Sequence, residues 1–378
     1  MKLQRRRQLA PIAALGVLAL TLAACGSDAA TTDDATSGSD SGNAAVDGGD
    51  VDGGDLSGQL AGAGASSQES AMQAWIAGFQ GQYPDVSVAY DPVGSGGGRT
   101  QFIDGGVDFA GSDAALEGEQ AEAAALRCEP GEAAELPLYI SPIAVMFNLP
   151  GIDSLNMSPQ TIAGIFNGDI TRWDAEEIAA DNPDVELPDL AITPVNRSDE
   201  SGTTDNFTEY LAAAAGDAWP HEPSGNWPVS GTQSAQGTSG VVQTVTEGEG
   251  AITYADASRA GSLGTVAVGV GESFVPYSPE AAAAVVAASP LAEGRGEASL
   301  VRELERDTTA EGTYPIVLVS YSIACTSYED AETAALVKAF LTYVASEEGQ
   351  EQAAGAAGSA PISAEIRDEV MEIVDAIS

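Results

Sequence analysis

The chain has 378 residues, of which 44% are hydrophobic and 6% aromatic, so it can bury the cores of two domains of ordinary size. It carries 57 acidic against 14 basic residues, and its formal net charge of -43 argues against nucleic acid or an anionic membrane surface as a partner. Any anionic ligand must therefore be held by local dipoles and a few well-placed groups. The acidity itself is typical of a solvated surface that keeps an exported protein soluble.

The first 24 residues are typical of an export signal. A basic start with Lys2 and three arginines precedes an apolar stretch. This stretch ends in Leu22-Ala23-Ala24-Cys25, which resembles the lipobox of bacterial lipoproteins, where the Cys thiol is lipidated and becomes the mature N-terminus. We therefore expect residues 1–24 to be removed and Cys25 to carry a lipid anchor such as palmitate. The alternative is a short transmembrane anchor with an incidental Cys, but the apolar run is shorter than a bilayer span.

Two further cysteines, Cys128 and Cys325, lie far apart in the sequence. In an exported chain a disulfide between them is the default, and two free buried thiols are the alternative. The only histidine is His221. Its isolation argues against metal clusters of the His/Cys type and against a nucleophile activated by histidine, so we expect no metal, no cofactor and no catalytic residue.

Residues 25–55 are expected to form a disordered tether, because they are mainly Ser, Thr, Asp, Gly and Ala with almost no large apolar side chain. A short strand is expected at 58–63. Apolar residues then recur at helical spacing, at Met72, Trp75, Ile76, Phe79 and Tyr83. Ser66 followed by Glu69 has the pattern of a capping box, which predicts that this helix begins immediately after the turn at 62–64.

Strand and helix signals alternate through the rest of the chain. Strands are expected at 86–90, 107–110, 143–147, 192–195, 252–254 and 316–321. Ser-Pro pairs at 158–159 and 278–279 mark helix starts, and 330–378 is compatible with helix almost throughout. This alternation predicts α/β domains with largely parallel sheets. The pattern leaves open whether two domains follow one another or the chain crosses over and returns.

Four segments place glycines and small hydroxyl residues where a strand gives way to a turn or a helix. They are Gly-Ala-Ser-Ser at 64–67, Gly-Ser-Gly-Gly at 94–97, Gly-Ser-Asp at 111–113 and Asn-Arg-Ser-Asp-Glu-Ser-Gly-Thr at 196–203. Helix N-termini expose unpaired N–H groups and the positive end of the helix dipole, while Ser and Thr add hydroxyl donors. One such segment is usually only a turn. A cluster of such segments would suit a tetrahedral oxyanion, which presents four acceptor oxygens.

In order and spacing, five motifs resemble the phosphate-binding receptors of bacterial phosphate ABC importers. The motifs lie at 62–66, 93–97, 107–113, 165–173 and 197–204, and the resemblance runs from about residue 56 to the C-terminus. It implies an α/β, type II periplasmic-binding-protein fold, with two α/β domains joined by a two-strand hinge around a ligand cleft. One domain would comprise 56–137 plus 321–378, and the other 138–320. The implied partners are inorganic phosphate, an ABC permease and a cytoplasmic ATPase, with the receptor anchored outside the cytoplasmic membrane.

The ligand contacts of that family map onto a defined set of residues. These are Ser66, Ser67, Ser95, Asp113, Arg197, Ser201, Gly202 and Thr203. The family commonly has a larger apolar residue at the position of Ser67, which implies contact through its N–H only. Arg197 can make paired N–H bonds to phosphate, oriented by Asp199. Asp113 can accept the proton that phosphate keeps near neutral pH, so it would discriminate against sulfate. The ordinary alternatives are a surface ion pair for Arg197 and a helix cap for Asp113.

Three other functions make different demands on the sequence. The first is a receptor for another oxyanion such as sulfate, molybdate or arsenate. Asp113 argues against sulfate, whereas arsenate is too similar to phosphate to be excluded. An exported hydrolase would need Ser201 or Ser95 as nucleophile, yet no histidine is placed to activate either serine and the Gly-x-Ser-x-Gly elbow is absent. A purely structural surface lipoprotein would not require the oxyanion cluster. The sequence therefore predicts a binding protein and not an enzyme.

Overall fold

The structure is a computed structural model that describes residues 56–378, which belong to one compact unit. The expected signal segment (1–24), the lipidation residue Cys25 and the expected tether (25–55) lie outside these residues. In the described part of the chain, no helix is both long enough and apolar enough to cross a membrane.

Strands from both ends of the described chain build the first part of the sheet, in the order β2-β1-β3-β11-β4. These strands are β1 (Gly58–Gly64), β2 (Val86–Asp91), β3 (Phe109–Ser112), β4 (Ala133–Phe147) and β11 (Val317–Cys325). β1 is parallel to β2 and β3, whereas β11 is antiparallel to both β3 and β4. All nine residues of β11 are buried, as expected for a β-branched and apolar strand that is covered on both faces.

The second part of the sheet continues from the far end of β4, in the order β4-β8-β6-β7, with β9 also paired to β4. Its other strands are β5 (Ser154–Met157), β6 (Thr193–Arg197), β7 (Gln233–Ala235), β8 (Ala251–Asp256), β9 (Gly264–Val270) and β10 (Ser273–Val275). β8 runs antiparallel to β4, while β6 is parallel to β8 and to β7. We call the β11 side of β4 the first lobe and the β8 side the second lobe.

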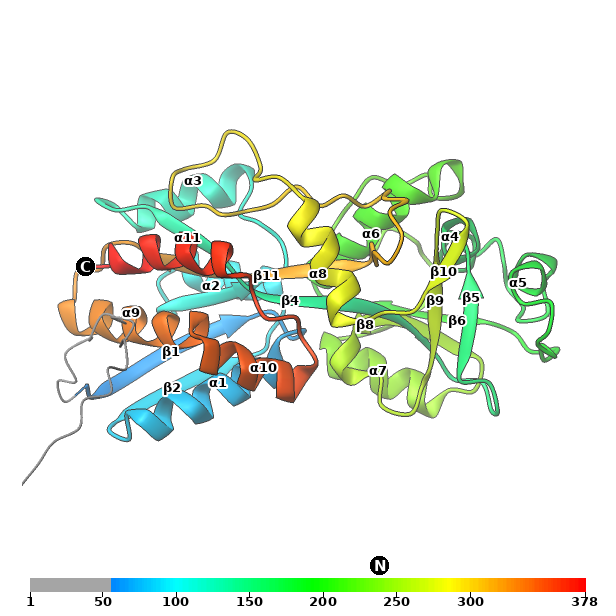
Figure 1. Ribbon diagram of the computed structural model, residues 1–378, viewed down its shortest axis with the longest axis horizontal. Coiled ribbons are helices and arrows are strands. Elements are labelled where there is room, and N and C mark those ends of the chain that lie inside the picture. Colours follow the sequence, from blue (N-terminus) through cyan, green and yellow to red (C-terminus); the bar gives the residue numbers. More distant parts are fainter. Residues whose placement is uncertain (1–55) are drawn as a thin grey trace, which may run out of the picture. The chain divides into compact units, whose positions relative to one another are not determined.

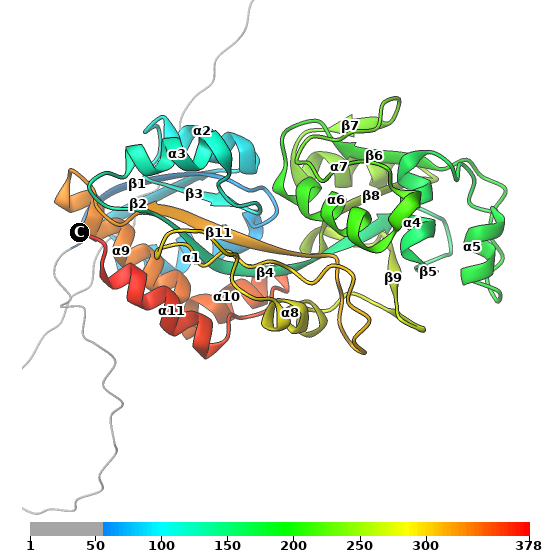
Figure 2. The ribbon, with the colours of Figure 1, turned by 90° about the horizontal axis from the view of Figure 1, so that it is seen from above.

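Helices cover both faces of the strands in each lobe (Figures 1 and 2). In the first lobe, α2 and α3 lie on one face, and α1, α9, α10 and α11 lie on the other. The helices of the first lobe are α1 (Glu69–Gln82), α2 (Ser95–Ile103), α3 (Gly118–Arg127), α9 (Ala331–Ala345), α10 (Glu347–Ala357) and α11 (Ala364–Asp375). The helices between β4 and β11 in the chain are α4 (Pro159–Asn167), α5 (Glu176–Asp181), α6 (Gly202–Ala214), α7 (Gly237–Glu247) and α8 (Pro279–Ala288), with short 3-10 turns at Gly216–Ala218 and Ala257–Arg259.

The two Ser-Pro helix starts form as predicted. Ser158 caps α4 by accepting a hydrogen bond from the N–H of Thr161, and Ser278 caps α8 in the same way, each with proline in the first turn. The predicted capping box of α1 is wrong, because this helix begins at Glu69 and the Ser66 hydroxyl bonds elsewhere. α2 begins at Ser95, directly after Gly94, which has a φ of 95°.

The chain crosses between the lobes within β4 and returns along β11. Residues Ala133–Pro142 of β4 pair with β11, and the following residues, Ile143–Phe147, pair with β8. The crossing-over arrangement that the sequence left open is therefore the one adopted. The sheet is mixed and not largely parallel, because the strands that connect the lobes run antiparallel. The domain boundaries at 137/138 and 320/321 stay a prediction.

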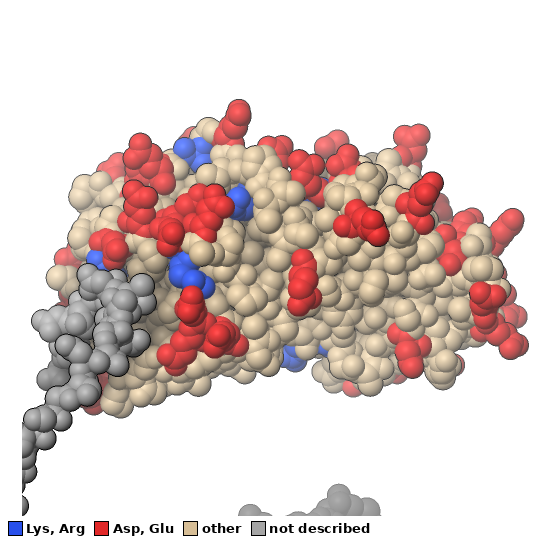
Figure 3. Space-filling view, viewed as in Figure 1, with Lys and Arg blue, Asp and Glu red and all other residues tan. Residues whose placement is uncertain are grey.

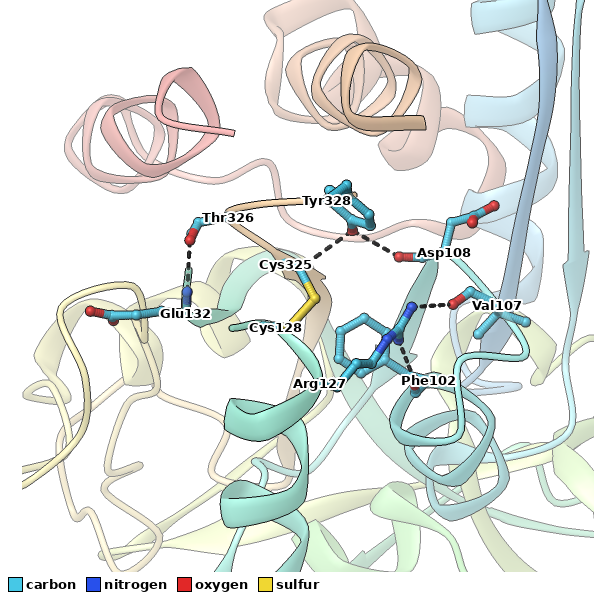
Figure 4. Close-up of a disulfide and its surroundings, with 9 residues drawn as sticks. All are labelled: Phe102, Val107, Asp108, Arg127, Cys128, Glu132, Cys325, Thr326 and Tyr328. Atoms are coloured by element: carbon cyan, nitrogen blue, oxygen red, sulfur yellow. Dashed lines mark hydrogen bonds between the residues drawn. A yellow bond between two sulfur atoms is a disulfide. The ribbon is translucent and has the colours of Figure 1, made fainter. Parts of the chain in front are cut away.

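A disulfide joins Cys128 at the end of α3 to Cys325 at the end of β11, as predicted (Figure 4). Both cysteines are buried. Beside them, the Tyr328 hydroxyl accepts the N–H of Cys325 at 3.0 Å and donates to the carbonyl oxygen of Asp108 at 2.8 Å. The bridge therefore fixes the last strand of the first lobe to the segment that precedes β4.

Candidate functional site

The N-terminal ends of four helices meet where the two lobes face each other. α1 and α2 belong to the first lobe, and α6 and α7 to the second. Hydrogen bonds cross between them: Thr203 of α6 donates to Asp113, and the hydroxyls of Ser66 and Thr238 lie 3.1 Å apart. Because helix N-termini carry unpaired N–H groups and partial positive charge, this meeting point favours an anion even in a strongly acidic protein.

Asp113 lies at the centre of the cluster and is 3% exposed. Ser67 Oγ donates to its two carboxylate oxygens at 2.7 and 2.8 Å, and Thr203 Oγ1 donates to Oδ2 at 2.9 Å. Its own N–H donates to Ser95 Oγ at 3.1 Å. Burial raises the pKa of Asp113, although hydrogen bonds from Ser67 and Thr203 and the charge of Arg197 act in the opposite direction. This carboxyl group is therefore suited to sharing a proton with a ligand.

Arg197 ends β6 and is also 3% exposed. It donates two hydrogen bonds to Asp199, from Nε to Oδ1 at 2.9 Å and from Nη2 to Oδ2 at 2.5 Å. Burial alone would raise the pKa of Asp199, but the hydrogen bonds and charge of Arg197, with the N–H of Gly237, lower it overall. A Cβ atom at Gly94 would lie 2.5 Å from Asp199 Oδ2, so only glycine lets the turn before α2 approach this pair.

The first residues of α6 are held tightly against the first lobe. Ser201 is the N-cap and accepts the N–H of Thr204 at 3.2 Å. A Cβ atom at Gly202 would lie 2.7 Å from both Asp113 Cβ and Ser95 Oγ. A side chain at this position would therefore keep the two lobes apart.

The structure brings the predicted site residues to this one region. Ser67, Ser95, Gly202 and Thr203 lie against Asp113, while Ser66, Arg197 and Ser201 lie at the adjoining helix starts and strand end. The hydroxyl of Ser67 donates to both oxygens of Asp113. Ligand contact through the N–H of Ser67 alone stays a prediction.

Three residues of the region were missed by the sequence analysis. The N–H of Thr238 donates to Ser66 Oγ at 3.1 Å, Asn206 Nδ2 donates to the Asp113 carbonyl oxygen at 2.7 Å, and Arg99 bonds to Glu200 across the lobes. Thr238 could have been found, because Gly-Thr-Ser at 237–239 repeats the pattern of the other turns before an apolar helix. Asn206 and Arg99 have no local signal, since their contacts depend on the packing of α2 and α6.

A cavity of about 800 Å³ opens beside the cluster and is lined from both lobes. It borders Asp113, Ser201 and Gly202. Within residues 56–378, no group of three His, Cys, Asp or Glu side chains could hold a metal ion. His221 does not line this cavity; it shares a hydrogen bond with Asn167 at 2.9 Å. The cluster beside the cavity offers hydroxyl and N–H donors, the guanidinium of Arg197 and the buried carboxyl group of Asp113, and these groups suit the binding of a small oxyanion.

The fold and this cluster together define a two-lobed α/β binding protein. In agreement, the model of the PBP superfamily domain matches residues 31–348. Phosphate-binding protein PstS 3 of Mycobacterium tuberculosis is 34% identical over 375 residues, which cover 97% of this chain and 98% of that protein. PstS 2 of the same organism is 33% identical over 331 residues, 85% of this chain and 87% of that protein. The chain therefore belongs to the PstS family of phosphate-binding proteins within the PBP superfamily.

Solved structures agree on the fold. A high-affinity periplasmic phosphate-binding protein bound with phosphate superimposes with a TM-score of 0.66 at 22% identity, covering 83% of this chain and 93% of that one. The phosphate-binding protein from Stenotrophomonas maltophilia gives a TM-score of 0.64 at 20% identity, covering 84% and 94%. The predicted family and fold class, two α/β domains with a two-strand hinge, are confirmed.

Proposed function

We propose that this protein binds inorganic phosphate outside the cytoplasmic membrane and delivers it to the permease of an ABC importer. The observation that carries the proposal is the 34% identity to a phosphate-binding protein over 97% of the chain. The donors and the carboxyl group gathered between the lobes support it independently. Closure of the lobes over phosphate would signal occupancy to the permease, and a cytoplasmic ATPase would drive transport.

The proposed phosphate contacts are the groups of the central cluster. Hydroxyls and N–H groups at the starts of α1, α2 and α6 donate to the phosphate oxygens, and Arg197 adds the one cation of the set. Nε and Nη2 of Arg197 donate hydrogen bonds to Asp199, which thereby orients the guanidinium group. The full set is Ser66, Ser67, Ser95, Asp113, Arg197, Ser201, Gly202 and Thr203.

Asp113 is proposed to select phosphate over sulfate. Near neutral pH phosphate carries at least one proton, which Asp113 can accept in a hydrogen bond, whereas fully ionised sulfate would place two acceptors face to face. Burial makes the repulsion between the two acceptors costly, because the buried carboxylate has little contact with water. Arsenate keeps a proton as phosphate does, so Asp113 gives no basis for rejecting it.

The acidic surface supports a receptor for a small ligand and not a nucleic-acid binder. Acidic side chains are spread over the face shown in Figure 3 with few Lys or Arg residues among them, which leaves no broad basic surface on that face for a polyanion. We assign no catalytic residue and no cofactor.

Cys25 is proposed to hold the protein to the outside of the membrane through its lipid, so that membrane association is lost in a Cys25→Ser variant.

The experiment that tests the function is titration calorimetry on residues 26–378, unfolded and refolded to remove bound ligand. Phosphate is expected to bind at one site and sulfate to give little response. In Asp113→Asn the preference for phosphate is expected to fall at least about tenfold, because the amide can donate to sulfate. Asp169→Asn, which changes an exposed carboxylate, is the control and should match the wild type. Absence of phosphate binding by folded, stripped wild-type protein would overturn the proposal.

A further inference from the structure

Arg99 of α2 is nearly buried and makes three side-chain hydrogen bonds. Nε donates to Gln120 Oε1 and Nη1 to Ser112 Oγ, both at 2.8 Å and both within the first lobe. Nη2 donates to Glu200 Oε1 of the second lobe at 2.6 Å. The first two bonds fix the guanidinium in place, and the third crosses between the lobes.

Glu200 lies in the turn between the Arg197–Asp199 pair and the start of α6. Its side chain rests on the first turn of α2, where a Cβ atom at Gly96 would lie 2.5 Å from Glu200 Cδ. The N–H of Gly96 also points to the Glu200 carbonyl oxygen at 3.4 Å. Glu200 therefore meets α2 through both its side chain and its main chain. Its side chain is 42% exposed, against 7% for Arg99, so the pair lies at the rim of the cleft.

We propose that Arg99 and Glu200 form a clasp that holds the lobes closed over phosphate and thereby sets its release rate. The clasp rests on the proposed function but deepens it, because neither residue belongs to the proposed phosphate contacts. Both are positioning residues, which act on the ligand by stabilising the closed arrangement.

The geometry explains why this pair acts mainly on the closed state. Gln120 and Ser112 hold Arg99 before the lobes meet, so closure costs little additional side-chain entropy on the arginine side. Lobe opening removes the contact with Glu200, while Arg99 can keep its two partners in the first lobe. An ion pair present only when the lobes are closed slows dissociation and leaves association nearly unchanged.

Partial exposure limits the size of the effect. A half-exposed, charge-assisted pair contributes modestly and is screened by salt, so we expect its loss to speed phosphate release about threefold to tenfold. Arg99 also bonds to Ser112, next to Asp113, so its replacement disturbs the site as well as the clasp. Glu200 is therefore the cleaner residue to change.

The test is stopped-flow measurement of phosphate association and release in Glu200→Gln, Arg99→Gln and the double variant. Glu200→Gln should release phosphate about threefold to tenfold faster, with association within about twofold of wild type. In the Arg99→Gln background the same change should have almost no further effect. Glu347→Gln is the control, because it removes an ion pair, with Arg367, that lies within the first lobe. High salt should speed release from the wild type more than from Glu200→Gln.

The outcomes separate the clasp from the function on which it rests. If wild-type protein does not bind phosphate, the proposed function is wrong. If the wild type binds and Glu200→Gln releases phosphate at the wild-type rate, the clasp is wrong. The clasp is also wrong if Glu200→Gln speeds release equally with and without Arg99.

Discussion

Asp205, in the first turn of α6, is a carboxylate at the cavity that the phosphate proposal does not use. Burial and the nearby charge of Glu209 raise the pKa of Asp205 to about 6, although Arg99 and Arg306 act in the opposite direction. Between about pH 4 and 6 the folded protein therefore holds more protons at this residue than the unfolded chain does. The contribution of Asp205 to the free energy of unfolding therefore decreases as the pH rises through this window, and it stays low at higher pH.

Replacement of Asp205 by Asn should therefore stabilise the protein at pH 8 and have little effect at pH 4. A shift of two pKa units corresponds to at most about 3 kcal/mol, and we expect about 1 to 2 kcal/mol because the side chain is partly solvated and the helix N-terminus favours its charge. Urea unfolding at the two pH values measures the change, with the exposed Asp169→Asn as control. An equal gain at pH 4 and pH 8 would show that the charge of Asp205 is not the cause.

At the scale of elements, the start of α6 must come unusually close to the first lobe for the site to close. Gly202→Ala should weaken phosphate binding at least about tenfold, because the added methyl would lie 2.7 Å from Asp113 Cβ and Ser95 Oγ. Alanine in a first helical turn should not lower the unfolding temperature of the ligand-free protein, since it is the better helix former. Calorimetry and thermal unfolding measure the two effects separately.

The control for Gly202→Ala is Gly355→Ala on the exposed side of α10, where no atom lies within 4 Å of the added methyl. It should leave phosphate binding unchanged and raise stability by about 1 kcal/mol. Unchanged phosphate affinity in Gly202→Ala would mean that the lobes need not come this close.

Helix starts show which parts of the structure the sequence could predict. The starts of α4 and α8 were predictable because Ser158 and Ser278 each cap a residue three positions away. Ser66 has the same local pattern, yet its hydroxyl meets Thr238, which is 172 residues away in the sequence. A local pattern indicates that a cap can form, and only the tertiary packing decides which donor or acceptor is nearer.

At the scale of the whole molecule, the candidate site could be predicted only in part. Four Gly and hydroxyl segments were visible in the sequence, but their convergence follows from the way β4 and β11 connect the lobes, and the resemblance to a family supplied that expectation. The clasp of Arg99 and Glu200 could not be predicted, because residues 101 positions apart meet only after both lobes have folded and closed.

The first lobe is assembled from the two ends of the described chain, with the second lobe inserted between them, and the disulfide closes this 197-residue separation. Loss of the bridge in a Cys128→Ala/Cys325→Ala variant should lower the free energy of unfolding by about 3 to 5 kcal/mol, mainly because the unfolded chain is freed of a long loop constraint. Phosphate affinity should stay within about twofold of the wild type, since neither cysteine lines the cavity. Urea unfolding and calorimetry provide the two measurements, and wild-type protein unfolded under reducing conditions should match the variant. Unchanged stability would show that packing alone joins the two ends of the first lobe, whereas a large loss of affinity would show that the bridge also shapes the site.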